Sequence, residues 1–379
     1  SSRDHLLSSE VYLLGRFHGQ CKSFDCFSSG EGCITAIRCK MPTVNLPSRD
    51  IHLNYHAFGN GPELVVFVNG FLMTYHGWCA QVEFFTRKEN AEKYTILVFD
   101  NRGVGRSSPV TGPCNVSTLA LDLLALLSEL QWTTFHLVGI SMGGMISLEI
   151  AARAPSRLRS LVLMNTHGGG WGAIPPKVGI ETVFKSVLNP TDLSIGNRNN
   201  FGNAVFADEA ARKRLSSAAA ESWLRLRSIE RNPDVGRTLH VHESTGPKPN
   251  RVAFSTFLVQ GLGTFLHYIS LARLRIIRDA HVPTTIVVST DDTLVRPSNS
   301  RGLYKVLAAP WVRLHTFENG GHAIIMEAVN EVNHLLLEHL ETVQAAAAKA
   351  DGLRDFRWSE LTPRTVVTSS VGVVHLSKL

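Results

Sequence analysis

Short apolar runs recur between residues 43 and 317, and polar or glycine-containing segments separate them. The run at 63–69 reads ELVVFVN, and the run at 94–99 reads YTILVF. Continuous apolar runs of this length are typical of strands that are buried on both faces of a parallel sheet. We therefore predict strands at 43–46, 51–56, 63–69, 94–99, 135–139, 159–164, 284–290 and 312–317.

Amphipathic segments lie between several of these predicted strands. Residues 117–130 (STLALDLLALLSEL) carry apolar side chains at helical spacing, and residues 142–152 follow the strand at 135–139 almost directly. A helix between consecutive parallel strands provides the right-handed crossover that such a sheet requires. The pattern therefore predicts an α/β protein with a mostly parallel sheet and helices on both of its faces.

The alternation of strands and crossovers stops at residue 168. The following segment contains Pro175, Pro176 and two amphipathic stretches, 210–227 and 254–277. We predict that residues 168–281 form a helical cap inserted into the core. The predicted organisation is an N-terminal extension at 1–40 with no evident leader, a core at 41–167 and 282–343, the cap, and a C-terminal tail at 344–379.

Composition limits the classes of protein to consider. The chain has 379 residues, of which 44% are hydrophobic, so it can bury a full core. It contains no run of about 18 uncharged apolar residues, so we predict no transmembrane segment. Its six cysteines include no C-x-x-C pair, and we interpret them as scattered reduced thiols rather than metal ligands.

The net charge of +6 is unevenly distributed. Residues 168–281 hold fifteen Lys and Arg against nine Asp and Glu, whereas the rest of the chain has 23 of each sign. No long Lys/Arg run or nucleic-acid-binding signature is present, so we predict no nucleic-acid partner. The excess is either a solvated face or an attraction for an anionic substrate or a membrane surface.

Ser141 lies in the turn between the predicted strand at 135–139 and the predicted helix at 142–152, and Gly139 and Gly143 flank it. Side chains at these glycines would collide with the returning chain in so sharp a turn. The turn would hold the Ser141 hydroxyl above a helix N-terminus, which favours a developing oxyanion. The alternative is an ordinary strand-to-helix turn that happens to contain a serine.

Residues 139–166, GISMGGMISLEIAARAPSRLRSLVLMNT, resemble the nucleophile elbow and the following strand of the α/β-hydrolase superfamily, in its esterase and lipase branch. The resemblance covers about residues 42–343. It implies the α/β-hydrolase fold, with a mostly parallel eight-stranded sheet and a helical cap. It also implies that the backbone N–H groups of Phe71 and Met142 form the oxyanion hole, although Asn69 stands where the family commonly has histidine.

The resemblance also assigns an acid and a base. In STDDTLVRP at 289–297, Asp292 takes the family's acid position, Ser289 replaces a glycine, and Asp291 is the alternative acid. His322 follows two glycines and precedes a predicted helix, where the superfamily places its histidine. The order Ser141, Asp292, His322 is the superfamily's chain order. His322 would act as general base towards Ser141, and Asp292 would fix the imidazole tautomer.

Other motifs receive structural interpretations. The loop DNRGVGRS at 100–107 resembles the loop after the fourth strand in many members, and we interpret it as a turn pinned by Asp100 and Arg102 rather than as a substrate site. At helical spacing, His334 is predicted to be solvated and His339 to be packed.

The sequence thus predicts a serine hydrolase that cleaves a carboxylic ester or thioester with an apolar acyl group, without a metal or cofactor. An acyl-CoA or an anionic lipid would suit the basic cap. A prolyl-aminopeptidase-like peptidase and a ligand-binding protein with the hydrolase fold are the alternatives. Serine at the nucleophile position argues against the epoxide hydrolase and dehalogenase branches.

The tripeptide Ser377, Lys378, Leu379 matches the address that the peroxisomal import receptor reads. We therefore expect the protein in the peroxisome matrix, with that receptor as a partner.

Overall fold

The computed structural model describes residues 43–170, 254–348, 356–358 and 366–370, together with a few positions between 173 and 181. The predictions for the extension at 1–40, for most of the cap and for Ser377–Leu379 lie outside the described residues.

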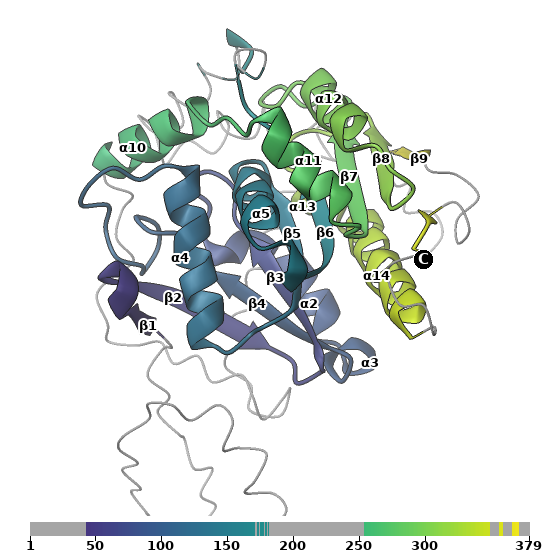
Figure 1. Cartoon of the computed structure of the whole chain (residues 1–379), viewed down its shortest axis with the longest axis horizontal. Helices are drawn as coiled ribbons and strands as arrows, with labels where there is room; N and C mark the ends of the chain where they lie inside the picture. The colour runs from purple at the N-terminus through teal and green to yellow at the C-terminus, as the bar shows by residue number, and fades with distance from the viewer. Residues whose placement is uncertain are drawn as a thin grey trace, which may run out of the picture. The chain divides into compact units, whose positions relative to one another are not determined.

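A nine-stranded sheet forms the centre of the described chain, with strand order β1-β2-β4-β3-β5-β6-β7-β8-β9 (Figure 1). The pairs β1·β2 and β2·β4 are antiparallel, and the remaining pairs are parallel. The predicted mostly parallel, eight-stranded sheet is confirmed as β1 to β8. The strands are β1 (Thr43–Leu46), β2 (Ile51–Phe58), β3 (Glu63–Val68), β4 (Tyr94–Phe99), β5 (Phe135–Ile140), β6 (Leu158–Met164), β7 (Thr284–Ser289), β8 (Val312–Glu318) and β9 (Val366–Ser370).

Helices cover both faces of the sheet, and each face has its own hydrophobic core. Alternate residues of a strand point to opposite faces, so Val66 packs in one core and Val65 in the other. The first core includes α4 (Val116–Glu129), α5 (Met142–Arg153), α11 (Leu271–Asp279) and α12 (Pro297–Leu307). The second includes η2 (Tyr75–Trp78), α2 (Cys79–Phe85), α13 (Ile324–Glu327) and α14 (Val329–Ala347). The other described helices are η1 (Pro47–Arg49), α3 (Lys88–Ala91), η3 (Pro155–Arg157) and α10 (Phe254–Phe265).

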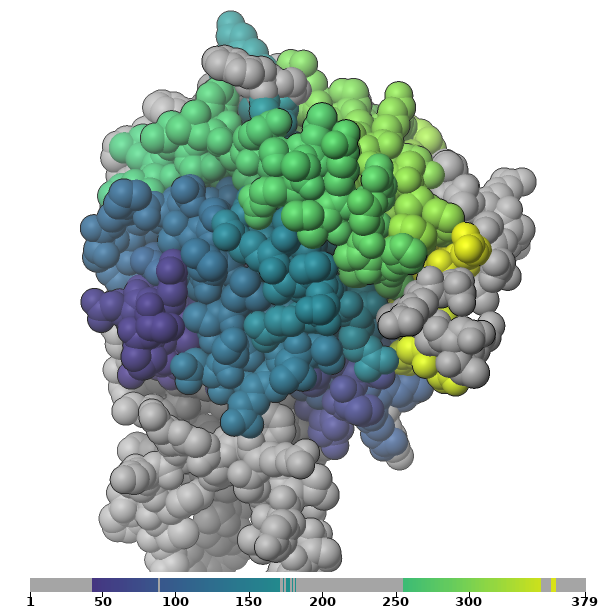
Figure 2. All heavy atoms as spheres, in the orientation of Figure 1, coloured from purple at the N-terminus to yellow at the C-terminus, as the bar shows by residue number. Residues whose placement is uncertain are grey.

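The amphipathic stretch at 254–277 contains α10 and the first part of α11. The second helix begins where the Ser270 side chain accepts a hydrogen bond from the N–H of Arg273. Both helices lie against the α4 and α5 side of the molecule (Figure 2). Sequence analysis predicts α11 as the end of the cap, and its Leu274 and Ile277 side chains are buried in the first core.

An ion pair explains the position of α11. The guanidinium of Arg273 donates to both carboxylate oxygens of Glu149 on α5, at 2.8 and 2.9 Å. Glu149 is only 2% exposed, and a buried carboxylate requires such a partner. Burial raises the pKa of Glu149, but the hydrogen bonds and charge of Arg273 outweigh it and hold the pKa below its ordinary value.

Part of the predicted C-terminal tail packs against the rest of the chain. Helix α14 continues to Ala347, and β9 adds to the sheet in parallel with β8. Trp358 is fully buried, donates its indole N–H to the Trp311 carbonyl at 3.0 Å, and lies under the guanidinium of Arg313. Sequence analysis misses this packing because an isolated tryptophan in polar sequence has no periodicity to report.

Candidate active site

Ser141 lies between the end of β5 and the start of α5 with φ 55° and ψ −124°. Positive φ is uncommon for a residue with a side chain, and such strain is characteristic of functional turns. Contacts from the β6 end fix the turn. The Ser141 N–H donates to the Met164 carbonyl at 2.9 Å, and the Ser141 carbonyl accepts from Thr166 Oγ1 at 2.7 Å. The Ser141 side chain makes no helix-capping hydrogen bond, and the residue is partly exposed.

The two flanking glycines lie where the turn has no room for side chains. A Cβ atom at Gly139 would lie 2.4 Å from the Gly143 carbonyl oxygen, and one at Gly143 would lie 2.2 Å from the Val68 carbonyl oxygen. Contacts this short are sterically forbidden, so β3, β5 and α5 approach closely only because glycine occupies both positions.

Asp292 and His322 meet at the same edge of the sheet, after β7 and β8 respectively. His322 Nδ1 lies 2.8 Å from Asp292 Oδ2. Asp292 Oδ1 accepts the backbone N–H groups of Leu294 and Val295, both at 2.8 Å. One carboxylate oxygen is therefore held by the backbone and the other faces the imidazole. Asp292, not Asp291, is the carboxylate paired with His322.

The His322–Asp292 pair is shielded, since the side chains are 12% and 1% exposed. Ser141 follows β5, and the carboxyl ends of parallel strands share one edge of a sheet. Among the described residues, no hydrogen bond joins the Ser141 hydroxyl to His322. The structure thus brings Asp292 and His322 into contact, and Ser141 lies at the same edge of the sheet. Catalytic hydrogen bonds often tighten only when substrate binds.

The loop after β3 lies beside Ser141. A Cβ atom built at Gly70 would lie 3.5 Å from Ser141 Cβ. Phe71 follows Gly70, and its ring centroid is 5.8 Å from that of Phe257 on α10. Met142 is the first residue of α5, so its N–H has no intrahelical acceptor. Phe71 thus belongs to the loop beside the turn, and Met142 follows Ser141 directly at the start of α5.

The DNRG loop supports the loop after β3. The Asp100 carboxylate accepts N–H groups from Tyr75 at 2.9 Å, Asn54 at 2.9 Å and Arg106 at 3.2 Å. Burial raises the pKa of Asp100, and these donors offset part of the rise. Arg102 is bound to Asp122, at 2.7 and 2.9 Å. These contacts agree with a structural role for the loop.

The departure from the family pattern at Asn69 also has a structural account. The Asn69 side chain is fully buried and donates to the Phe99 carbonyl at the end of β4. Its amide joins two neighbouring strands just before the loop that carries Phe71, so the backbone there is fixed without a histidine.

His167 is a neighbour of the site that sequence analysis misses. Burial, with smaller contributions from His267 and His322, lowers the pKa of His167 to about 4. Its Nδ1 accepts the N–H of Gly169 at 3.0 Å. His167 is therefore neutral at physiological pH. With sixteen histidines in the chain, composition alone could not single it out.

The histidines of α14 lie as predicted. His334 is exposed, and its Nδ1 pairs with the Asn330 carbonyl at 2.7 Å. His339 is fully buried, with its Nδ1 2.8 Å from Thr285 Oγ1.

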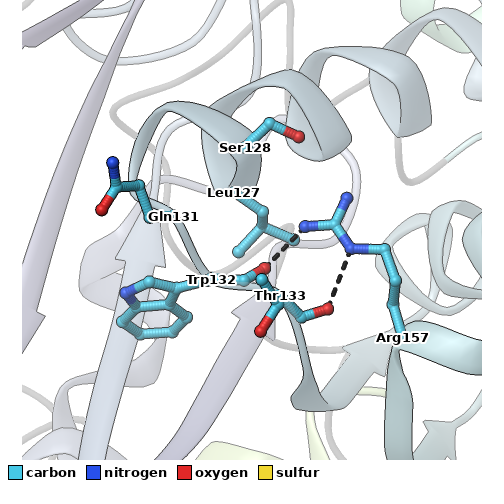
Figure 3. Close-up of a pocket in the computed structure, with 6 residues that line it drawn as sticks. All are labelled: Leu127, Ser128, Gln131, Trp132, Thr133 and Arg157. Atoms are coloured by element: carbon cyan, nitrogen blue, oxygen red, sulfur yellow. Dashed lines mark hydrogen bonds between the residues drawn. The ribbon is translucent and has the colours of Figure 1, made fainter.

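A surface hollow of about 520 Å³ lies between the end of α4 and the start of β5, at the edge of the sheet opposite Ser141 (Figure 3). Arg157 donates to the Trp132 and Thr133 carbonyls there, at 2.6 and 3.1 Å. The hollow offers no carboxylate, imidazole or thiol, and Ser128 donates its hydroxyl to the Leu124 carbonyl. It is lined by Leu127, Ser128, Gln131, Trp132, Thr133 and Arg157.

Within the described ranges, no group of three or more His, Cys, Asp and Glu side chains is arranged to hold a metal ion. None of the helices described has both the length and the apolar character needed to cross a bilayer.

Residues 63–329 match the family described as "alpha/beta hydrolase fold". The chain therefore belongs to the α/β hydrolase family and is a hydrolase of the α/β fold.

Individual proteins that resemble this chain share about a third or less of their residues with it over the matched region. A 3-oxoadipate enol-lactonase of Acinetobacter baylyi is 33% identical over 122 residues, which is 32% of this chain and 44% of that enzyme, so the match spans less than half the enzyme's length. A putative carbamate hydrolase, RutD, of Pseudomonas savastanoi pv. phaseolicola is 29% identical over 278 residues, covering 72% of this chain and 91% of the relative.

Solved structures share the fold at low identity. An esterase from Thermogutta terrifontis has a TM-score of 0.58 at 18% identity, covering 80% of this chain and 99% of that one. The enol-lactonase from Burkholderia xenovorans has the same TM-score and identity, with 79% and 100% coverage.

Proposed function

We propose that the protein is a serine hydrolase that cleaves a carboxylic ester or thioester with an apolar acyl group. The observation that carries the proposal is the 2.8 Å contact between His322 Nδ1 and Asp292 Oδ2 at the edge where the strained Ser141 lies. This pairing directs the other imidazole nitrogen, Nε2, away from the carboxylate and leaves it to accept a proton.

The reaction would proceed in two halves. His322 Nε2 takes the Ser141 proton as Ser141 Oγ attacks the acyl carbon, and the oxyanion accepts N–H groups of Phe71 and Met142. The imidazolium then gives its proton to the leaving alcohol or thiol, and Ser141 keeps the acyl group. Water, deprotonated by His322, attacks this acyl-enzyme, and Ser141 Oγ leaves with a proton as the carboxylic acid is released.

Apolar surroundings support an apolar acyl group. Phe71 and Phe257 face each other from the core and α10, and His167 is neutral, so these neighbours offer no fixed charge to an acyl chain. The relative named enol-lactonase is also consistent with ester cleavage, since a lactone is a cyclic carboxylic ester.

The two alternatives make different predictions. A prolyl-aminopeptidase-like enzyme requires an acid that binds the substrate amine, and it would release amino acids from peptides. A ligand-binding protein with the hydrolase fold would bind an ester without turnover. The paired His322 and Asp292 at the sheet edge of Ser141 favour an enzyme, and turnover of an ester by the folded chain would separate it from a binding protein.

Labelling of the full chain with a fluorophosphonate probe tests the proposal. Probe attachment requires an activated serine, so we expect covalent labelling mapped by mass spectrometry to Ser141, and its loss after heat denaturation. Failure of the folded chain to label, or labelling at another serine, would reject Ser141 as the nucleophile.

The location in peroxisomes is also part of the proposal, and it rests on the sequence Ser377, Lys378, Leu379. A fluorescent protein fused ahead of residues 1–379 is expected to accumulate in peroxisomes. Deletion of the three residues is expected to move it to the cytosol with ester hydrolysis retained, because they follow the last described strand. Cytosolic location of the full fusion in cells with normal peroxisomal import would contradict the targeting.

A further inference from the structure

Asn165 follows β6 and connects three elements beneath the candidate site. It is 1% exposed and adopts φ 45°, a left-handed conformation that asparagine tolerates better than most residues. Its backbone N–H donates to the Val287 carbonyl of β7 at 3.0 Å. Its side chain points into the loop between β8 and α13, which carries His322.

The Asn165 amide lies within hydrogen-bond distance of three residues, Ser289, Gly321 and His322. Nδ2 lies 3.0 Å from the His322 carbonyl oxygen, 3.1 Å from the Gly321 carbonyl oxygen and 3.0 Å from Ser289 Oγ. Oδ1 accepts the backbone N–H of Ser289 at 3.0 Å. The Ser289 N–H fixes which amide end is oxygen, so the two N–H groups of Nδ2 are shared between the His322 loop and the Ser289 hydroxyl.

This arrangement explains why the residue is asparagine. An aspartate has the same shape but no N–H, so a carboxylate oxygen would face the carbonyl oxygens of Gly321 and His322. An alanine would leave these buried carbonyls without their donor. Ser289, which replaces the family's glycine, adds its hydroxyl to the same set of contacts.

The His322 backbone is held from a second side as well. The Gly321 N–H donates to Glu327 Oε2 at 2.8 Å, while Asn165 holds the Gly321 and His322 carbonyls. Only two torsions separate the His322 backbone from its imidazole ring. A shift of the backbone therefore moves the ring with it.

We propose that Asn165 is a positioning residue for His322: its amide fixes the backbone from which the imidazole contacts Asp292 and would act as general base towards Ser141. The inference rests on the proposed function, because it assigns His322 the role of general base. Displacement of a catalytic group by about 1 Å can cost roughly a hundredfold in rate.

The test compares Asn165→Ala and Asn165→Asp with a matched control, Asn333→Ala, in the full chain. Asn333 is also a buried asparagine that donates to a carbonyl, that of Ala80, but it lies on α14 away from His322. We expect kcat for a short-chain ester to fall roughly a hundredfold in both Asn165 variants, with KM changed less than about twofold. Asn333→Ala is expected to keep kcat.

A spectroscopic measurement separates positioning from general destabilisation. The proton between His322 Nδ1 and Asp292 should give a far-downfield proton resonance in the folded chain. It is expected to shift or broaden in the Asn165 variants and to stay in Asn333→Ala. If Asn165→Ala does not fold, Asn165→Asp, which has the same shape, carries the test.

The outcomes distinguish the inference from the function on which it rests. Full kcat and an unchanged resonance in the folded Asn165 variants would overturn the positioning role. So would equal losses in Asn333→Ala. If the wild-type chain fails to label with the fluorophosphonate, the proposed function fails, while the effect of Asn165 on the resonance can still be measured and decides the positioning itself.

Discussion

Ser141→Ala is expected to lower kcat for an ester by at least about ten thousandfold. The alanine removes the attacking oxygen, and whatever rate remains comes from oxyanion stabilisation and substrate binding. The free energy of unfolding is expected to change by less than about 1 kcal/mol, because the hydroxyl makes no capping hydrogen bond and its removal leaves no large cavity. Initial rates with a chromogenic short-chain ester, together with urea unfolding, measure both quantities.

Ser128→Ala is a suitable control for this variant. Ser128 lies on α4, at the edge of the sheet opposite Ser141, and donates to the Leu124 carbonyl. It should keep the wild-type rate. A Ser141→Ala enzyme with more than a few per cent of the rate, and a second serine labelled by fluorophosphonate, would disprove the assignment.

The central part of the fold is predictable from the sequence because the local signals are strong and redundant there. The run YTILVF at Tyr94–Phe99 is fully buried in β4, and both β5 and the following helix appear around Ser141 as predicted. Each signal depends on residues close together in the chain. A buried parallel strand needs a continuous apolar run, and the tight turn needs glycine.

Other features depend on contacts between distant residues, which leave no local pattern. Strand β9 forms because β8 offers a free edge, and Trp358 is buried because Trp311 and Arg313 make a place for it. The packing of α11 depends on distant residues in the same way, since Arg273 binds a glutamate more than a hundred residues earlier.

In the candidate site, too, some residues are marked by local sequence and others only by contacts between distant residues. Ser141 could be singled out because Gly139 and Gly143 flank it in the sequence. His322 could be singled out because it follows two glycines and precedes a predicted helix, where the superfamily places its histidine. The choice between Asp291 and Asp292 depends on the turn after β7, which directs only Asp292 to the imidazole. Asn165 could not be predicted, because its importance lies in four contacts made across gaps of more than a hundred residues.

Asp292→Asn is expected to lower kcat by about ten thousandfold, whereas Asp291→Asn is expected to lower it by less than about tenfold. The reason follows from the hydrogen bonds of Asp292. Its Oδ1 accepts the N–H groups of Leu294 and Val295, and only the oxygen of an asparagine amide could keep those bonds. The NH₂ group would then face His322 Nδ1 and donate to it.

An imidazole that accepts a hydrogen bond at Nδ1 carries its proton on Nε2, and this tautomer cannot take the proton of Ser141. Asp292→Asn should therefore keep the fold and nearly the same geometry while losing the general base. Asp291 donates its N–H to the Gly320 carbonyl through the backbone, which Asp291→Asn leaves in place. The measurement is kcat for both variants at neutral pH, with thermal unfolding as the control for folding. Equal losses in the two variants, or a larger loss in Asp291→Asn, would show that Asp292 does not orient His322.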